Sequence, residues 1–387
     1  MRIRDLKFII SSVILWRVVL FAILFIALKT ITLQDNFLGG SKSMYLQNPL
    51  LWAWGNFDGE HYLFISKYGY NPHQYYFFPL YPYLVRLFAV LSRQGLDKYH
   101  LLGLVVSHIF FVAGLAGLWK LIKLDYNIKV AKISLLIILL FPVSFFFVSF
   151  YTESLFLALV VWALYFARKK MWVGACILGA LASATRIIGL VLIPVFIIEF
   201  ISQYSNAVCK PSYKRIVITF LAFISVSVGL IVYMIFLNHI TGDFFAFSKS
   251  GYIYGEYFSD KPVFILQVFY RYIFKIVPNL NWNYFPVVFS TLLEFLVAIL
   301  LALLSLVGLF RLRLSYWFFM VSGFIFPTLY VNFVSLPRYA LVLFPMYILI
   351  ADILSNKNVL VKVSAYTILF VGLIISLMLF SRGYRIA

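Results

Sequence analysis

Residues 8–28 read FIISSVILWRVVLFAILFIAL, and Arg17 is the one charged side chain among them. A membrane-spanning helix needs about 20 mainly apolar residues, because each residue advances it by about 1.5 Å through roughly 30 Å of hydrocarbon. This stretch therefore predicts a spanning helix. Arg17 lies near its middle, and because charged groups avoid lipid we expect its side chain to face protein in a structural role.

The composition extends this prediction to the whole chain. Of 387 residues, 64% are hydrophobic and 12% are charged, whereas about 25% are charged in an average soluble domain. Apolar runs recur throughout, without an internal repeat or a soluble segment, and predict an all-α polytopic membrane protein that forms one domain over residues 1–387. About eleven transmembrane helices are predicted, at residues 8–28, 101–119, 133–150, 154–168, 172–185, 187–203, 216–238, 284–310, 315–334, 339–354 and 362–380.

The net charge of +19 follows the positive-inside rule, by which Lys and Arg gather in cytoplasmic loops. With a cytoplasmic N-terminus, eleven spans place the basic loops on one side: Lys120, Lys123, Lys129 and Lys132; Arg168, Lys169 and Lys170; Lys210, Lys214 and Arg215; Arg311 and Arg313; Lys357 and Lys362. We therefore expect no nucleic-acid partner. The predicted location is the cell membrane, or the membrane of the endoplasmic reticulum in a eukaryote.

This topology leaves two long loops on the non-cytoplasmic side, at residues 29–100 and 239–283. It also requires that residues 80–95 do not cross the membrane. We predict that they form a helix lying on the bilayer surface, with Arg86 and Arg93 toward water.

The first long loop contains the most polar stretch of the chain, FDGEHYLFISKYGYNPHQYYFFPLYP at residues 57–82. Only 13 of the 387 residues are acidic, and two of them, Asp58 and Glu60, flank a glycine here. Residues 58–67 are predicted to form a short helix, whose N-terminus favours an ionised Asp58. His61 and Tyr62 follow on the same helical face. Asp58 is thus a candidate general base toward a hydroxyl group, although an Asp at this position also caps helices.

Three further ionisable residues are predicted at the same membrane border. Glu153 follows a Phe-Tyr-Thr sequence where a spanning helix begins, so it is either part of a site or a first-turn residue that compensates the helix dipole. Arg186 and Arg338 lie in tight non-cytoplasmic turns. A guanidinium matches a phosphate through two parallel hydrogen bonds, so both arginines suit an anionic lipid phosphate, or else they pair with Asp58 and Glu153.

Several motifs are absent from the sequence. It contains no GxxxxGK[ST] or GxGxxG loop, no HExxH and no D-x-D pair, so a nucleotide-dependent cytoplasmic enzyme is poorly supported. An activated substrate would then arrive on a lipid. No metal-ligand motif is present, so no metal site and no bound cofactor are predicted, while a divalent-metal requirement is left open.

Several segments together resemble the PIG-V family, the GPI mannosyltransferase 2 enzymes and their bacterial relatives within the GT-C glycosyltransferases. The first is Phe57-Asp58-Gly59-Glu60-His61-Tyr62-Leu63-Phe64-Ile65, followed by Gly69-Tyr70 and by Phe77-Phe78-Pro79-Leu80-Tyr81-Pro82. The others are Pro142-Val143-Ser144 with Tyr151-Thr152-Glu153, Ala182-Ser183-Ala184-Thr185-Arg186 with Gly189-Leu190, and Pro337-Arg338-Tyr339. The family usually has Trp where this chain has Phe57, which bears on the choice of acceptor.

The resemblance implies a GT-C fold and transfer of mannose, or a related hexose, from a polyprenyl-phosphate donor to a glycan or glycolipid acceptor on the non-cytoplasmic face. Asp58 would be the base and Glu153 a second catalytic residue. Arg186 and Arg338 would hold the carrier phosphate. The motifs would also bring Glu60, His61, Tyr62, Tyr151 and Tyr339 to the substrates. One displacement by the acceptor hydroxyl would invert the anomeric configuration.

Two other classes of protein remain as alternatives. A flippase or transporter of lipid-linked sugars would also be polytopic, basic and aromatic, but it is expected to carry ionisable residues near the bilayer midplane and broken helices in paired halves. A non-catalytic membrane scaffold would not need Asp58, Glu153 and Arg186 at one depth.

Overall fold

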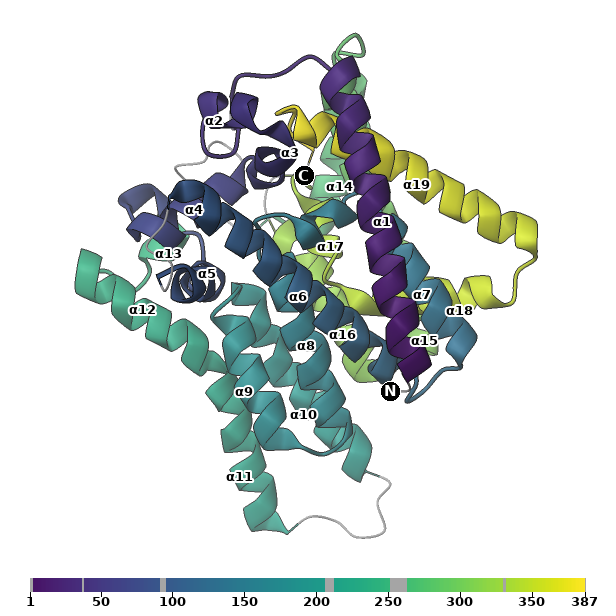
Figure 1. The fold of residues 1–387 in the computed structure, drawn as a ribbon. Helices are drawn as coiled ribbons and strands as arrows, with labels where there is room; N and C mark the ends of the chain where they lie inside the picture. Colours follow the sequence, from purple (N-terminus) through teal and green to yellow (C-terminus); the bar gives the residue numbers. More distant parts are fainter. Residues whose placement is uncertain are drawn as a thin grey trace.

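The structure is a computed structural model that describes residues 3–36, 38–90, 95–205, 212–250, 263–329 and 332–386. Every regular element within these ranges is a helix (Figure 1), and the chain is an all-helical membrane protein. Six described helices are long and apolar enough to cross a membrane: α1 (Ile3–Thr30), α6 (Leu96–Ile122), η4 with α10 (Ile187–Tyr204), α11 to α12 (Ile216–Thr241), α15 (Phe285–Arg311) and α19 (Val359–Ser381).

The other five predicted spans correspond to shorter helices: α7 (Ile128–Leu140), α8 (Glu153–Arg168), α9 (Trp172–Ser183), α16 (Leu314–Thr328) and α18 (Phe344–Ser355). The prediction of one continuous helix over 133–150 was wrong. Pro142 has no N–H and disfavours helical backbone at the residue before it, so α7 ends at Leu140 and a 3₁₀ helix, η3 (Ser144–Val148), follows.

The last two short spans also differ from the prediction. The helix predicted over 315–334 ends at Thr328. The one predicted over 339–354 is divided into α17 (Leu336–Ala340) and α18, with Pro345 in the first turn of α18. A proline is tolerated in a first turn, whose N–H has no intrahelical partner, but not in a helix interior.

The remaining short elements lie mainly in the two long loops. They are α2 (Lys42–Gln47), α3 (Pro49–Trp52), η1 (Ala53–Gly55), α4 (Asp58–Tyr68), η2 (Pro72–Gln74), α5 (Leu80–Val90), α13 (Ala246–Ser250), α14 (Ile265–Arg271), the π-helical turn η7 (Tyr272–Ile276) and η8 (Val277–Asn279). The predicted helix over 58–67 is confirmed as α4.

Helix α5 occupies the segment predicted to lie on the bilayer surface. Its 11 residues extend about 16 Å, too short to cross a membrane alone. Tyr81 and Val85 are buried against the protein, whereas Leu87 and Phe88 are exposed and Arg86 is half-buried. Arg93 lies outside the described residues.

Helix α8 is largely enclosed by the protein and lies between α6 and α9 (Figure 1). All of its first nine residues, Glu153 to Val161, are buried, as expected for a helix that is apolar on every side. Small residues on α6 let neighbouring segments pack closely against this helix. A Cβ on Gly103 would lie 2.0 Å from the Phe150 ring, so only glycine leaves room for this ring just before α8.

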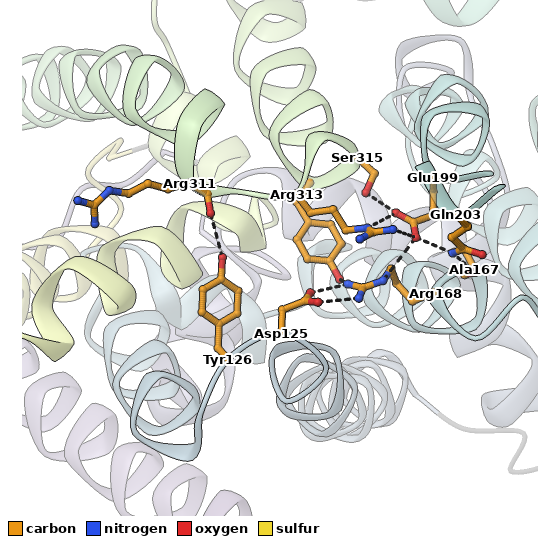
Figure 2. A network of polar contacts seen from close by, with 10 residues as sticks. Asp125, Tyr126, Ala167, Arg168, Glu199, Gln203, Arg311, Arg313 and Ser315 are labelled. Carbon is orange, nitrogen blue, oxygen red and sulfur yellow. Dashed lines mark hydrogen bonds and ion pairs between the residues drawn. The ribbon is translucent and has the colours of Figure 1, made fainter. Parts of the chain in front are cut away.

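The Arg168 end of α8 carries a dense polar network, which we call the Glu199 cluster: Asp125, Arg168, Glu199, Gln203, Arg313, Ser315 and Tyr316 (Figure 2). Contacts of Lys123 with Asp5, at 3.8 Å, and of Arg311 with Asp352, at 3.6 Å, lie on the same side of the bundle. Four residues of the predicted basic loops, Lys123, Arg168, Arg311 and Arg313, thus take part in ion pairs of this region, and Lys123 reaches the N-terminal segment at Asp5. Lys210 lies outside the described residues.

The C-terminal end of α19 holds the first long loop at the opposite end of the bundle (Figure 1). The Tyr45 hydroxyl donates to the Ser381 carbonyl at 2.5 Å, and Asn56 Nδ2 donates to the Phe380 carbonyl at 2.9 Å. Asn56 Oδ1 also accepts from the Gly39 backbone N–H at 2.9 Å. Hydrogen bonds of the buried Asn56 side chain therefore hold the loop that precedes Asp58 in place.

Candidate functional site

Asp58 is the first residue of α4, and the backbone before it is strained. Phe57 has φ of 57°, a left-handed conformation that is unfavourable for a residue with a Cβ and that proteins retain mainly where the surroundings enforce it. The enforcement is visible here, because the Asn56 carbonyl accepts from the Tyr151 hydroxyl at 2.7 Å. The strained turn directs Asp58 toward the start of α8.

The structure joins four of the predicted residues into one chain of ion pairs, the Glu153 cluster: Asp58, Glu153, Arg186 and Arg338. Arg338 Nη1 donates to Asp58 Oδ2 at 2.5 Å, and Arg186 Nη2 donates to Glu153 Oε1 at 2.5 Å. Arg338 Nε lies 3.7 Å from the same Glu153 oxygen. The sequence separation of Asp58 and Arg338 is 280 residues, so only tertiary packing brings them together.

The sequence analysis left open that Asp58 and Glu153 only cap helices or compensate a helix dipole. Their ion pairs favour a role in a site instead. Glu153 begins α8, but its carboxylate lies with two guanidinium groups. Arg186 is held by a second contact, in which Nε donates to Thr152 Oγ1 at 3.0 Å. Thr152 is therefore a positioning residue that the sequence analysis did not select, although it lies inside the Tyr-Thr-Glu motif.

The cluster is buried but its hydrogen bonding is incomplete. The Glu153 side chain has 0% exposure and that of Arg338 9%, whereas that of Asp58 has 33%. Three buried polar atoms of the cluster have no hydrogen-bond partner among the described residues: Glu153 Oε2, Arg186 Nη1 and Arg338 Nε. Since most buried polar groups in proteins are paired, these atoms indicate a place where another molecule completes the bonding. The exposure of Asp58 makes it the carboxylate that such a molecule reaches.

Aromatic rings surround the two arginines. The Tyr339 ring centroid lies 5.6 Å from the Arg186 guanidinium carbon and 5.8 Å from that of Arg338, and the Tyr151 ring lies 5.5 Å from that of Arg338. Cation–π attraction of this kind holds a guanidinium without using its N–H groups. Both predicted tyrosines therefore line the cluster.

The remaining predicted residues of α4 lie beside Asp58. Tyr62 is buried, with its ring 6.4 Å from that of Tyr151, and His61 stacks on Phe77 at 4.8 Å. His61 interacts electrostatically with Asp58, while burial lowers the His61 pKa below its ordinary value. Burial raises the pKa of Glu60, which has no ion-pair partner within the described ranges.

Two opposing effects determine the pKa of Asp58. Burial by itself raises the pKa of this carboxyl, but the charge of Arg338 and its hydrogen bond, helped by His61 and Arg385, lower it below the ordinary value of 3.8. Asp58 is therefore an anion in the free protein. It becomes a stronger base only when Arg338 is drawn away from it.

The loop that presents Arg338 depends on two residues missed from the sequence, Tyr272 and Glu294. The Tyr272 hydroxyl donates to Glu294 Oε2 at 2.8 Å and accepts from the Phe333 backbone N–H at 3.1 Å. Two residues later, Ser335 has φ of 62° and its carbonyl accepts from the Arg338 N–H at 3.0 Å. Glu294 could have been selected from the sequence, because a carboxylate inside a predicted span is rare.

The structure contains a nearly apolar groove of about 600 Å³. One of its lining residues, Ala184, precedes Arg186 by two positions in the sequence. The groove is formed by α5, α9 and α12 and is lined by Pro79, Leu80, Tyr83, Ala180, Leu181, Ala184, Val228, Gly229, Val232, Tyr233 and Phe236. The Leu80 backbone N–H donates to the Ala184 carbonyl at 3.1 Å, which ties the groove to the turn that carries Arg186.

The described residues contain no group of three or more His, Cys, Asp or Glu side chains placed to hold a metal ion. Comparison of the chain with known protein families, curated proteins and solved structures gives no match. Interpretation of the site therefore depends on its own geometry and on the motifs quoted above.

Proposed function

We propose that the protein is a GT-C-type glycosyltransferase that moves mannose, or a related hexose, from a polyprenyl-phosphate donor to a glycan or glycolipid acceptor. The observation that carries the proposal is the Glu153 cluster. Two arginines with unpartnered N–H groups and one accessible carboxylate converge from distant parts of the chain, next to an apolar groove.

In this proposal the donor phosphate completes the bonding of the arginines. Its oxygens accept from Arg186 Nη1 and Arg338 Nε, which have no acceptor in the free protein. Guanidinium groups suit this role because they match phosphate oxygens geometrically and stay charged. The polyprenyl chain lies in the groove beside Ala184.

The same contact activates the base. When the phosphate engages Arg338, the Arg338–Asp58 pair weakens, and burial then raises the pKa of Asp58. Asp58 accepts the proton of the acceptor hydroxyl, whose oxygen forms a bond to the anomeric carbon. The bond from that carbon to the phosphate oxygen breaks, and the phosphate leaves with the electron pair. The arginines stabilise the charge that develops on it, and the configuration inverts.

The finer topology belongs to the same proposal. Eleven spans with a cytoplasmic N-terminus place the Glu199 cluster at the cytoplasmic side and the Glu153 cluster at the other side. Helix α8 extends from one to the other over 16 residues, about 24 Å. The short helices α7, α8, α9, α16 and α18 would cross with help from the segments that adjoin them.

The test is transfer of radiolabelled mannose from polyprenyl-phosphate mannose in membranes that contain the wild type or Asp58→Asn. We expect transfer by the wild type and its loss in a folded Asp58→Asn protein. Equal transfer by both would remove Asp58 from the mechanism. No transfer by the wild type, with intact donor and a panel of hexoses and acceptors, would contradict the proposed activity.

A transporter of lipid-linked sugars is the second candidate, because Arg17 and Glu294 lie within candidate spanning helices. Asp58→Asn separates the two functions. Loss of transfer with unchanged movement of a fluorescent lipid-linked sugar across vesicles supports the enzyme, whereas movement that requires Glu294 and no transfer supports the transporter.

A further inference from the structure

A second pocket lies on the other side of α6, between α1, α3 and α6, and encloses about 420 Å³. Its lining is apolar except for Arg17 and His108: Phe21, Leu50, Leu51, Trp54, Leu101, Leu104, Val105 and Ile109 complete it. Leu101, Val105 and Ile109 are exposed on a candidate spanning helix. The pocket therefore opens toward lipid.

Arg17 is the unusual member of this lining. Its guanidinium carbon lies 3.8 Å from the ring centroid of Trp54 and 4.3 Å from that of Phe21. These contacts confirm that it faces protein, as the sequence predicted, but they do not supply an acceptor for Nη1. Nη1 is buried without a hydrogen bond, and no carboxylate within the described ranges forms an ion pair with Arg17.

No other lining residue balances this charge. His108 Nδ1 lies 2.6 Å from the Leu104 carbonyl oxygen, which can only accept, so that nitrogen donates and the ring supplies no negative charge. An arginine inside a membrane usually has a partner, because its transfer into lipid costs about 3 kcal/mol even on insertion scales. An anion would both accept from Nη1 and balance the charge of Arg17.

A lipid phosphate can approach Arg17 from the Thr30 end of α1. The guanidinium contacts the Phe21 ring, and because helical side chains lean toward the N-terminus it lies between the levels of Arg17 and Phe21, about 14–20 Å before Thr30 along the helix. The 28 residues of α1 extend about 42 Å, about 6 Å beyond a 30 Å hydrocarbon core at each end. The guanidinium is then about 8–14 Å below the hydrocarbon boundary on the Thr30 side. A lipid phosphate reaches this depth where the bilayer thins around a charged side chain.

We propose that this pocket, the Arg17 pocket, binds an anionic phospholipid from the membrane half at the Thr30 end of α1. A phosphate oxygen accepts from Arg17 Nη1, and an acyl chain covers Leu101, Val105 and Ile109. A phospholipid fits better than a soluble anion because the pocket opens on apolar surface, and the net charge of +19 favours an anionic head group. This inference is independent of the proposed transferase activity.

The test is lipid retention by the full chain in nanodiscs of phosphatidylcholine with a minor fraction of phosphatidylglycerol, read by native mass spectrometry. Arg17→Met should weaken phosphatidylglycerol binding by about tenfold or more, since a hydrogen bond to a charged group contributes about 1.5–3 kcal/mol. Lys29→Met is the matched control. It removes the same charge from the same helix, where Lys29 is exposed and lies 4.3 Å from the Phe25 ring.

A second variant keeps Arg17 and fills the pocket. Val105→Trp should lose the same phosphatidylglycerol molecule while it retains phosphatidylcholine like the wild type, and it decides the question if Arg17→Met does not fold. Equal phosphatidylglycerol retention by the wild type and Val105→Trp would overturn the proposal. So would an equal loss in Lys29→Met, which would indicate attraction by overall charge.

Discussion

Each end of α8 carries a cluster of carboxylates and arginines. The buried glutamate is fully hydrogen-bonded in one cluster and only partly hydrogen-bonded in the other. At the Arg168 end, Glu199 is fully buried and both of its oxygens are bonded: Oε2 accepts from Arg313 Nε and Ser315 Oγ, each at 2.7 Å, and Oε1 accepts from Gln203 at 2.6 Å and from Arg313 Nη2 at 2.9 Å (Figure 2). At the Glu153 end, Oε2 of an equally buried glutamate has no hydrogen-bond partner in the part of the chain that the structure describes.

The arginines differ in the same way. Arg168 forms a two-bond contact with Asp125, at 2.5 and 2.6 Å, and also donates to the Tyr316 hydroxyl (Figure 2). Arg186 and Arg338 each keep a buried nitrogen without an acceptor. In the Glu199 cluster the carboxylates and the arginines are paired and fasten helices together, and within the described residues only the neutral Gln203 Oε1 of this cluster is buried without a hydrogen bond. The Glu153 cluster is open, and the strained Phe57 and Ser335 lie on the segments that supply it, as is common at functional sites.

The largest expected difference concerns activity. Asp58→Asn should lower sugar transfer by about 10²–10⁴-fold, the usual contribution of a general base. Asp125→Asn makes the same chemical change in the Glu199 cluster and should leave the transfer rate of the folded protein unchanged. Initial rates at equal amounts of folded protein measure both, and equal losses would contradict a special role for the Glu153 cluster.

Stability should respond in the opposite order. Glu199→Ala leaves the half-buried Arg313 without its carboxylate and removes the 3.4 Å contact of Arg168, which keeps Asp125. It should lower the free energy of unfolding by up to about 3–5 kcal/mol. Asp58→Asn should lower it by less than about 1 kcal/mol, because the Asp58 side chain is 33% exposed, an amide oxygen can still accept from Arg338, and Arg338 keeps Glu153 at 3.7 Å. Denaturant unfolding in one detergent compares them. A larger loss in Asp58→Asn would indicate that Asp58 mainly stabilises the fold.

A smaller effect is expected from the support of Arg338. Tyr272→Phe removes the hydroxyl between Glu294 and the Phe333 N–H, which should lower the free energy of unfolding by about 1–3 kcal/mol. Because Arg338 would be held less firmly, KM for the donor should rise about tenfold. Steady-state kinetics with varied donor distinguish the roles. The same stability loss with an unchanged KM would make Tyr272 structural only.

The smallest effect is a pH dependence. Arg338 holds the pKa of Asp58 below 3.8 in the folded protein, so the stability from ionised Asp58 is fully present above that pH. It is lost as the pH falls through the folded pKa. The wild type should therefore lose more stability between about pH 5 and pH 3 than Asp58→Asn, which lacks this group. Thermal unfolding at low ionic strength measures the difference, and parallel curves would show that the pair contributes nothing.

Much of this organisation was predictable from local sequence. The length of the apolar runs identified α1, α6, α15 and α19 within about five residues, because lipid solvates apolar side chains and backbone groups must bond within their own helix. The rarity of charged residues pointed to the candidate site. Asp58, Glu153, Arg186 and Arg338 are charged residues at predicted membrane borders, in a chain with few acidic residues. The motif resemblance added their roles as proposals.

The sequence by itself thus determined an all-helical membrane protein and the residues worth examining. Only the tertiary structure decided which charges meet. It placed Arg338 on Asp58 across 280 residues, completed the bonding around Glu199 and left it incomplete around Glu153. Hydrogen bonds act over about 3 Å, so no local pattern distinguishes a satisfied buried carboxylate from an open one until distant helices are packed together.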